Sequence, residues 1–344
     1  MRGVDEECAG PQRQMRSMLE GMMAIQVVDL ARLSKVFYPV AYRKIQGARA
    51  KAKSFVYYTT AEVAESVIKY RQVWMRNALS MNDYMEIDHG RDCLRDALES
   101  RVGVRLKAAL DAAHAGIWAQ SYDKFRTMLP GIKRDTYITC VSEHLTKERS
   151  LGRLSMWRAY GAKSGVALVL NSEAILAEES VVGAVSSPVE YLDSAGFRRA
   201  MANVASGLHA ERDFLATIPR PLLEQYIFEM LRYAVLCVKH PGFAEEREWR
   251  IFVTNFLQHS DVLERTVHTV RGTPQHVLKI PMCKSVNSKL KRSFADVVQG
   301  VIIGPCAFPD IAARAFQDLL VGAGMDPEDA SRRVSISGIP LRHL

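Results

Sequence analysis

The chain has 344 residues, of which 48% are hydrophobic and 24% charged, a composition ordinary for a soluble globular protein with a sizeable core. Charged and polar residues interrupt the apolar stretch over residues 18–33, which excludes a secretory signal and a membrane span there. The net charge is +8, and residues 1–53 carry ten Lys and Arg against five Asp and Glu. We interpret this basic arm as a solubilising segment. Nucleic-acid binding through residues 1–53 is the less favoured alternative, because the aromatic residues there lie together around Pro39 and do not alternate with the charges.

The six cysteines are scattered, and no two of them have the Cys-x-x-Cys spacing. This pattern is typical of reduced thiols, so we expect a cytoplasmic protein with neither a disulfide framework nor a metal site. The glycine-rich dinucleotide motif, the P-loop, the zinc-protease helix and the nucleophile elbow are all absent from the sequence. Metal-dependent hydrolysis and redox chemistry therefore have no support in the sequence.

Apolar spacing and breaker residues predict the secondary structure in chain order. Residues 1–15 are polar and predict disorder, and residues 16–48 predict one or two helices that break at Pro39. Strands are expected at 54–60, 73–76, 136–143, 165–170, 246–253, 277–280, 300–303 and 334–339, with a weaker strand pair or irregular edge at 181–191. Helices are expected at 61–71, at 92–128 with an end at Pro130, at 154–160, at 193–239 with a break at Pro219 and Pro221, and at 311–320.

Strands and helices alternate without regular βαβ spacing, which predicts an α+β fold. We expect a mixed, mostly antiparallel sheet flanked by helices, with an N-terminal helical addition. The addition is the basic, partly disordered segment over residues 1–50, and a single α+β domain follows over residues 51–344.

The most informative stretch is Phe243–Val253, which begins with crowded acids and bases and ends in an aromatic, β-branched run. If it is extended from residue 246, side chains alternate between faces, so Glu246, Glu248 and Arg250 share one face and Trp249 lies on the other. Two interpretations are open. The face belongs to an exposed edge strand in which Arg250 pairs with a neighbouring glutamate, or one of the glutamates is catalytic or orients a ligand. A carboxylate beside a ribose accepts a hydroxyl hydrogen bond and stabilises a developing oxocarbenium charge.

Three other segments carry candidate residues. Tyr57, Tyr58 and Thr59 end a predicted strand, where rings beside hydroxyls suit a flat ligand. Asn82-Asp83-x-x-Glu86 indicates a turn that opens a helix.

The third segment combines Ser142 and Glu143 with a short predicted helix. Trp157 and Tyr160 share a face of that helix, as core or as stacking groups, and Arg158 points elsewhere, toward solvent or an anion.

The order of these motifs resembles a bacterial family known as domain of unknown function 2971. The resemblance covers about residues 54–342 and leaves residues 1–50 unmatched. It rests on the segments Tyr57-Tyr-Thr-Thr, Trp74, Asn82-Asp83, Cys140-Val-Ser-Glu143, Met156-Trp-Arg-Ala-Tyr160, Gly165-Val-Ala-Leu, Lys239-His240, Phe243, Glu246-x-Glu248-Trp-Arg250, Val301-Ile-Ile-Gly-Pro305 and Ser335-Ile-Ser-x-Ile-Pro340. The chain has Asn-Asp-Tyr where this family has Asn-Asp-Pro, and the family name implies no activity.

The arrangement is also similar, at the level of the fold, to ADP-ribosyltransferase-like domains. That similarity implies that Tyr58 and Thr59 hold the nicotinamide ribose and that Tyr160 or Trp157 stacks on the nicotinamide. A late glutamate, Glu248 or Glu246, would stabilise the ribose cation. The chain departs from those domains because no His or Arg stands on the first strand.

The leading hypothesis is therefore an enzyme that transfers ADP-ribose or cleaves NAD, as a toxin or a phage-defence effector. Arg250 and Arg158 would meet the pyrophosphate, and the acceptor of the transfer is open. The alternative is a non-catalytic sensor in which the same face grips a nucleotide or a partner. A third option is nucleic-acid binding through the basic arm, which predicts steep salt dependence.

Overall fold

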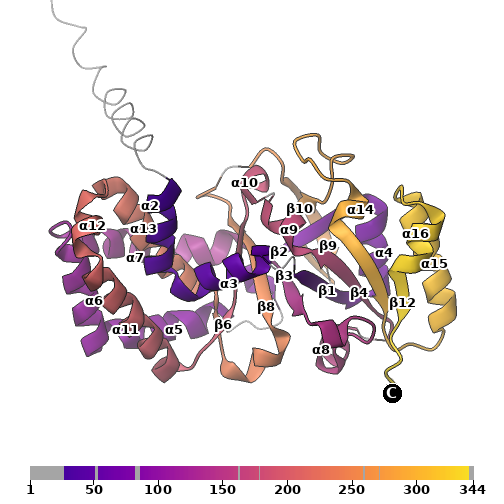
Figure 1. Cartoon of the computed structure of the whole chain (residues 1–344), viewed down its shortest axis with the longest axis horizontal. Helices are drawn as coiled ribbons and strands as arrows, with labels where there is room; N and C mark the ends of the chain where they lie inside the picture. The colour runs from indigo at the N-terminus through magenta and orange to yellow at the C-terminus, as the bar shows by residue number, and fades with distance from the viewer. Residues whose placement is uncertain are drawn as a thin grey trace, which may run out of the picture. The chain divides into compact units, whose positions relative to one another are not determined.

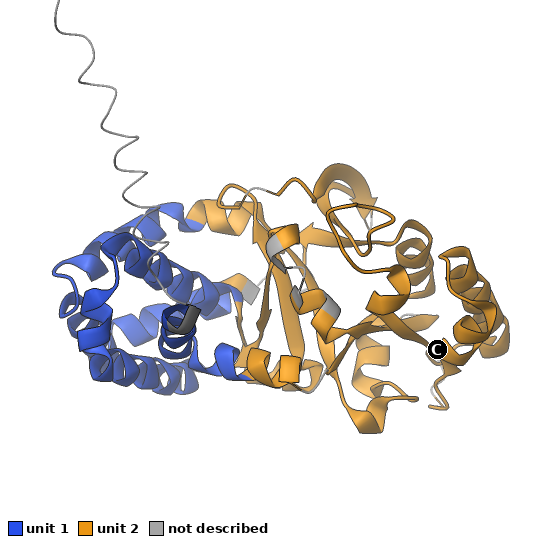
Figure 2. Cartoon of the chain, turned by 45° about the horizontal axis from the view of Figure 1, so that its top comes forward, with its two compact units in different colours: residues 1–43, 88–129, 192–236 blue, residues 44–87, 130–191, 237–344 orange. Residues whose placement is uncertain are grey.

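The structure is a computed structural model that describes residues 27–50, 53–81, 86–161, 163–177, 179–258, 260–270 and 272–340. The predicted disorder of residues 1–15 and the turn at Asn82-Asp83 lie outside these residues. Contacts divide the chain into two compact units, shown in two colours in Figure 2. We call residues 1–43, 88–129 and 192–236 the helical unit, and residues 44–87, 130–191 and 237–344 the sheet unit.

The helical unit packs helices from three separate parts of the chain. Its helices are α2 (Val27–Phe37), α5 (Glu86–Leu98), α6 (Arg101–Asp111), α7 (Ile117–Asp135), α11 (Ser194–Ala210), α12 (Arg212–Thr217) and α13 (Arg220–Leu236), of which α5 begins and α7 ends beyond the unit boundary. Phe37, Leu110 and Leu231 are among its fully buried side chains. One domain was expected over residues 51–344, but residues 88–129 and 192–236 instead join the N-terminal helices in this unit.

The single helix predicted over residues 92–128 is wrong, because the structure breaks it into three. Ser100 caps α6 by accepting a hydrogen bond from the backbone N–H of Val102 at 3.1 Å, and Gly116 adopts a φ of +71° just before α7. The end predicted at Pro130 is also wrong, since α7 continues to Asp135 and thereby buries Ile132 completely.

The sheet unit holds a ten-stranded sheet of described strands in the order β12-β11-β4-β1-β3-β2-β10-β9, with β8 pairing β3 and β5 (Figure 1). Its strands are β1 (Ser54–Thr60), β2 (Gln72–Asn77), β3 (Thr136–His144), β4 (Gly165–Asn171), β5 (Val185–Pro188), β8 (Glu248–Thr254), β9 (Glu264–Val270), β10 (Thr273–Pro281), β11 (Val298–Ile303) and β12 (Val334–Ile336). A separate two-stranded ladder joins β6 (Glu190–Tyr191) and β7 (Val238–Lys239). Only the β11–β12 pair is parallel within the larger sheet, so the predicted α+β fold with a mostly antiparallel mixed sheet is confirmed.

Strand β3 is the branching point of this sheet. It pairs with β8 on one edge over residues 136–142. On its other edge it pairs with β1 at residues 142–144 and with β2 at residues 137–138. On that edge, no described strand pairs with β3 between residues 138 and 142, and β1 and β2 diverge there.

Helices cover the two faces of the sheet around β1 and β4. They and the 3₁₀ turns of the unit are α3 (Pro39–Ala50, which crosses the unit boundary), α4 (Ala61–Tyr70), η1 (Ala78–Ser80), η2 (Thr146–Glu148), α8 (Leu154–Tyr160), α9 (Ser172–Ala177), α10 (Glu179–Val182), η3 (Pro241–Glu246), α14 (Phe294–Val297), α15 (Pro309–Gly322) and α16 (Pro327–Arg333). On one face, Tyr58 and Ile302 pack against Trp157 of α8. On the other, Phe55 and Trp249 share a core with residues of α4 and α15. In the described part of the chain, no helix combines the length and apolarity that crossing a bilayer requires.

Candidate functional site

A strand was predicted from residue 246 onward, but the first two residues of that stretch are not extended. Glu246 ends the 3₁₀ turn η3, Arg247 adopts a left-handed backbone with φ of 45°, and the strand begins only at Glu248. The alternation therefore holds from Glu248 onward, where Trp249 packs on Phe55 with ring centroids 4.8 Å apart. Glu246 reaches the same side as Glu248 through the turn and not through strand alternation.

The two glutamates meet at a buried lysine that sequence reasoning did not select. Lys239 Nζ lies 2.7 Å from Glu246 Oε2 and 3.1 Å from Glu248 Oε2. Glu248 Oε1 accepts from Arg250 Nε at 2.8 Å, and the Tyr160 hydroxyl donates to Glu246 Oε1 at 3.2 Å. We call Tyr160, Lys239, Glu246, Glu248 and Arg250 the glutamate cluster. It contains two carboxylates and two cations, so its charges balance when both glutamates are ionised.

The environments of the two glutamates shift their pKa values in opposite directions. Glu248 is 6% exposed, and burial opposes its ionisation, but the charges of Arg250 and Lys239 outweigh burial and lower its pKa to about 2. At Glu246 the order is reversed: burial raises the pKa more than Lys239 lowers it. The Glu246 side chain is still 16% exposed, so of the two it is the carboxylate that a ligand can reach.

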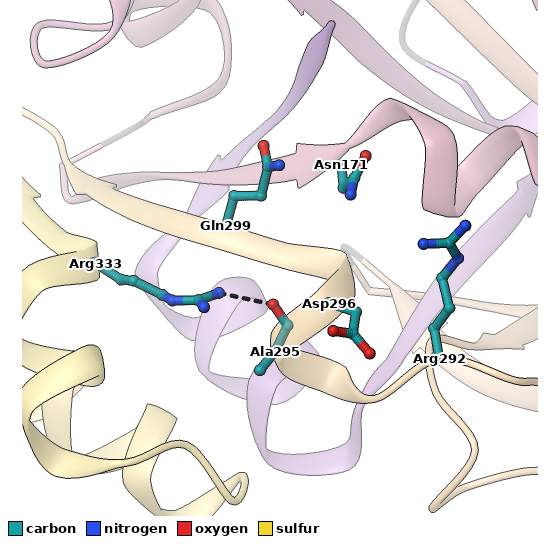
Figure 3. Close-up of a pocket in the computed structure, with 6 residues that line it drawn as sticks. All are labelled: Asn171, Arg292, Ala295, Asp296, Gln299 and Arg333. Carbon is teal, nitrogen blue, oxygen red and sulfur yellow. Dashed lines mark hydrogen bonds between the residues drawn. The ribbon is translucent and has the colours of Figure 1, made fainter. Parts of the chain in front are cut away.

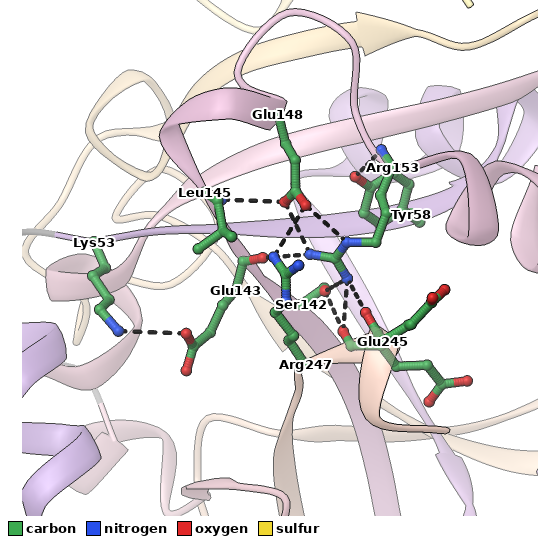
Figure 4. Close-up of polar contacts among 10 residues, drawn as sticks. Lys53, Tyr58, Ser142, Glu143, Leu145, Glu148, Arg153, Glu245 and Arg247 are labelled. Carbon is green, nitrogen blue, oxygen red and sulfur yellow. Dashed lines mark hydrogen bonds and ion pairs between the residues drawn. The ribbon is translucent and has the colours of Figure 1, made fainter. Parts of the chain in front are cut away.

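A second network, centred on Arg153, holds the turn that carries Glu246 (Figure 4). Arg153 Nη1 donates to the backbone carbonyl oxygens of Glu245 at 2.5 Å and Glu246 at 3.2 Å, and Nη2 donates to that of Glu143 at 2.9 Å. Glu148 neutralises the guanidinium through Nε at 3.1 Å and Nη2 at 3.0 Å. We call this arrangement the Arg153 clamp.

The clamp also fastens the left-handed residue of the turn. Arg247 Nη1 donates to Glu148 Oε1 at 3.0 Å, and the Ser142 hydroxyl donates to the Glu246 carbonyl. A non-glycine residue with positive φ is strained and persists where surrounding contacts determine the backbone. Arg153 and Glu148 supply those contacts, and both are less than 10% exposed.

Two of the rings expected at a nucleotide site are enclosed: Trp157, expected to stack on the nicotinamide, and Tyr58, expected to hold the ribose. Trp157 is 1% exposed, and its ring approaches so close to Gly152, Gly165 and Gly304 that a Cβ at any of them would lie 3.0 Å or less from it. Tyr58 meets Trp157 edge-on with centroids 5.0 Å apart. These rings therefore belong to the core under α8, and the expected stacking on Trp157 has no free face to use.

The hydroxyls of β1 are divided between the faces of the sheet. The Tyr58 hydroxyl accepts from the backbone N–H of Arg153 at 3.0 Å, and burial raises its pKa to about 12. Tyr57 and Thr59 lie on the opposite face, where their side chains hydrogen-bond. Tyr58 and Thr59 consequently cannot hold one ribose together, because neighbouring strand residues point to opposite sides.

The remaining predicted residues take different positions. Ser142 belongs to the Arg153 clamp, and its neighbour Glu143 accepts from Trp249 Nε1 at 3.0 Å and pairs with Lys53 Nζ at 3.4 Å. Arg158 is exposed on α8, and Tyr160 is half-buried against Glu246. Of the segments singled out in the sequence, Tyr160, Glu246, Glu248 and Arg250 are thus brought together.

An exposed ring that sequence reasoning did not select lies beside this cluster. Phe243 is 40% exposed, and Lys239 Nζ lies 4.6 Å from its ring centroid. Tyr191 supports the other side by accepting from the backbone N–H of Glu248 at 2.7 Å. A basic residue in the short strand before Glu246 is the signal that could have identified Lys239.

Two hollows in the sheet unit lie away from the cluster. One, of about 370 Å³, is a surface hollow (Figure 3) lined by Asn171, Arg292, Ala295, Asp296, Gln299 and Arg333. Its arginines are engaged within the chain: Arg333 donates to the carbonyl oxygen of Ala295, and Arg292 pairs with Glu173. The other hollow is smaller and apolar. Within the described residues, no three His, Cys, Asp or Glu side chains gather as metal ligands, and no disulfide joins the cysteines.

Comparison with known proteins agrees with one of the two resemblances. Residues 156–251 match the model of a family described as "Protein of unknown function (DUF2971)". The match runs from α8 to β8 and so contains the whole glutamate cluster. Searches of curated proteins and of solved structures gave no match.

Proposed function

We propose that this chain is an enzyme that uses NAD by breaking the bond between nicotinamide and ribose, with Glu246 as the carboxylate that meets the ribose. The observation that carries this proposal is the opposite shift of two neighbouring carboxylates within one cluster. Environments that push the pKa values of paired acids apart are typical of sites where the two acids have different roles. Glu248 then serves as the permanent counter-ion, and Glu246 is the group that acts.

The chemistry assigned to Glu246 follows from its charge and its partners. When the C1′–N bond breaks, nicotinamide leaves as a neutral molecule and the ribose carbon becomes oxocarbenium-like. An ionised Glu246 stabilises that positive charge, and the Tyr160 hydroxyl and Lys239 ammonium fix its orientation. Water or another acceptor then bonds to C1′ and releases a proton, which yields ADP-ribose or an ADP-ribosylated product.

Two exposed groups on the segments that carry the cluster extend this assignment. Phe243 offers a partly free ring for the nicotinamide or adenine, in place of the enclosed Trp157. Arg158 is exposed on the helix that carries Tyr160 and offers a charge for the pyrophosphate. Arg250 is completely buried against Glu248, so the pyrophosphate role expected for it passes to Arg158.

The test is nicotinamide release by the purified full chain, measured by chromatography with NAD as substrate. Replacing Glu246→Gln keeps the size of the side chain but removes its charge, and we expect the rate to fall by about 100-fold or more. Glu65→Gln is the matched control, because Glu65 is an exposed glutamate of α4 in the same unit. Equal rates for the parent and Glu246→Gln would remove the catalytic role of Glu246.

A binding module without turnover is the second candidate, favoured by the saturation of Glu248. Lys239 and Arg250 both pair with it inside the chain, as expected of a group that shapes a surface without reacting. This candidate gives NAD binding by calorimetry with no nicotinamide after prolonged incubation. The enzyme proposal gives product in the same tube.

A further inference from the structure

We infer that the apolar hollow between β1 and β2 is a binding site for a small, uncharged and mostly apolar molecule of about the size of phenol at most. It is separate from the glutamate cluster, so it does not rest on the proposed function. The hollow has a volume of about 90 Å³ and opens on the sheet face opposite α8. For comparison, an apolar protein cavity of roughly 150 Å³ takes up benzene.

The hollow follows from the branching of the sheet at β3. Because β1 and β2 leave the same edge of β3 at different points, residues 139–141 face a gap with no strand beside them in the described chain. Tyr57 of β1 and Val73 of β2 flank this gap, and Thr139 and Val141 form its floor. The hollow is therefore a product of backbone topology, and side-chain rotation alone does not close it.

The apolar core on this face is divided at the same place. One cluster contains Val141 and Leu170, and a second contains Val182 and Ala184, with Ile251 packed on it. All of these residues also line the hollow. Protein interiors are close-packed, so two apolar clusters on one sheet face would normally be continuous. The hollow is the space that separates these two.

The lining determines the chemistry of the ligand. It contains no charged side chain, so an ion would lose its hydration without a partner, whereas an apolar molecule gains from burial.

Hydroxyl groups in the lining, among them those of Tyr57 and Thr139, give the otherwise apolar wall a few polar points. Tyr57 is surrounded by protein, which raises the pKa of its phenol and keeps it neutral, yet the residue is only half-buried because it borders the hollow. Thr139 is 6% exposed on the neighbouring strand. A mostly apolar wall with a few placed polar groups is the usual make-up of a small-molecule site.

The test compares benzene, phenol and benzoate as ligands of the full chain; each has one aromatic ring, and only benzoate is charged at neutral pH. Binding to the native state raises the thermal unfolding midpoint in a saturable way. We expect benzene and phenol to raise the midpoint and benzoate to leave it unchanged. Absence of a shift with both benzene and phenol would overturn the inference, as would a shift with benzoate equal to that with phenol.

Variants then locate the site. Ala184→Leu places three additional carbon atoms in the hollow and should abolish both shifts, whereas Ala307→Leu, at an exposed loop position in the same unit, should retain them. Retained shifts in Ala184→Leu would place the ligand elsewhere and refute the site. Thr139→Val keeps the shape of the wall but removes its hydroxyl, and it tests the site even if Ala184→Leu fails to fold. In this variant the affinity for phenol should fall about fivefold, and the affinity for benzene should stay the same. Unchanged phenol affinity, or a loss of both ligands, would count against it.

Discussion

Replacing Glu248→Gln should destabilise the sheet unit far more than replacing Glu246→Gln. Glu248 is almost fully buried and pairs with both Lys239 and Arg250, so removing its charge leaves two buried cations with one carboxylate. The lowering of the Glu248 pKa from 4.5 to about 2 corresponds to about 3 kcal/mol of favourable interaction in the ionised state. Breaking a buried ion pair by removing one partner costs a similar amount.

The same shift fixes the pH range of the effect. The pKa of Glu248 is lower in the folded chain than in the unfolded chain, so its contribution is complete above the unfolded value near 4.5 and is lost as the pH falls toward about 2. The parent and Glu248→Gln should therefore differ most at neutral pH and converge in acid. For Glu246 the folded pKa is raised, so its charge opposes folding as the pH rises through that value, and Glu246→Gln should stay within about 1 kcal/mol of the parent at neutral pH.

The assay is urea unfolding followed by tryptophan fluorescence, because Trp157 and Trp249 are both buried in the sheet unit. Midpoints are compared at pH 7 and at pH 3, with Glu65→Gln as the exposed control. A Glu248→Gln variant as stable as its parent at pH 7 would refute the reasoning. It would show that burial of the carboxylate offsets all that Lys239 and Arg250 contribute.

Four other variants test three separate parts of the sheet unit. Arg153→Met and Glu148→Gln should each destabilise by about 3 kcal/mol, and a double-mutant cycle by urea unfolding should give a coupling of about 1–3 kcal/mol; additive effects would contradict the clamp. Gly304→Ala places a Cβ 2.8 Å from a backbone oxygen and from the indole ring of Trp157, so it should lower the free energy of unfolding by about 1–3 kcal/mol in the same urea measurement. An unchanged stability would mean that the core under α8 rearranges to accommodate the methyl group. Lys239→Met removes a cation that lowers the pKa of Glu246, so the pH–rate profile for nicotinamide release should move to higher pH; an unmoved profile would separate Glu246 from the rate.

Local structure in this chain is predictable where one physical signal dominates. The helix at 154–160 and the strand at 54–60 have the predicted bounds, because Gly161 follows the helix and Thr60 ends the strand by capping α4. The failures occurred where signals compete. Residues 92–128 carry a nearly continuous apolar stripe, which concealed the caps at Ser100 and Gly116.

The site was predictable in its residue types and unpredictable in its pairing. The sequence shows that burying the acids of the Glu246–Arg250 stretch would be unfavourable without a partner charge. In the structure that partner is Lys239, which lies on another strand, seven residues before Glu246. The role of Arg153 was not visible in the sequence, because three of the groups that it contacts are backbone carbonyls, which residue identity does not reveal. Likewise, the gap at residues 139–141 depends on which strands pair with β3.

Strand β3 contributes residues to both proposed sites, but from its two opposite faces. Cys140 and Ser142 point toward the polar side, where Cys140 hydrogen-bonds Glu248 and Ser142 joins the Arg153 clamp. Thr139 and Val141 point into the hollow on the opposite face. A substitution at Thr139 therefore reaches the glutamate cluster only through the β3 backbone, which β8 pairs over residues 136–142. Ligand binding in the hollow and turnover at Glu246 can consequently fail independently, and a variant that abolished both would indicate damage to β3 itself.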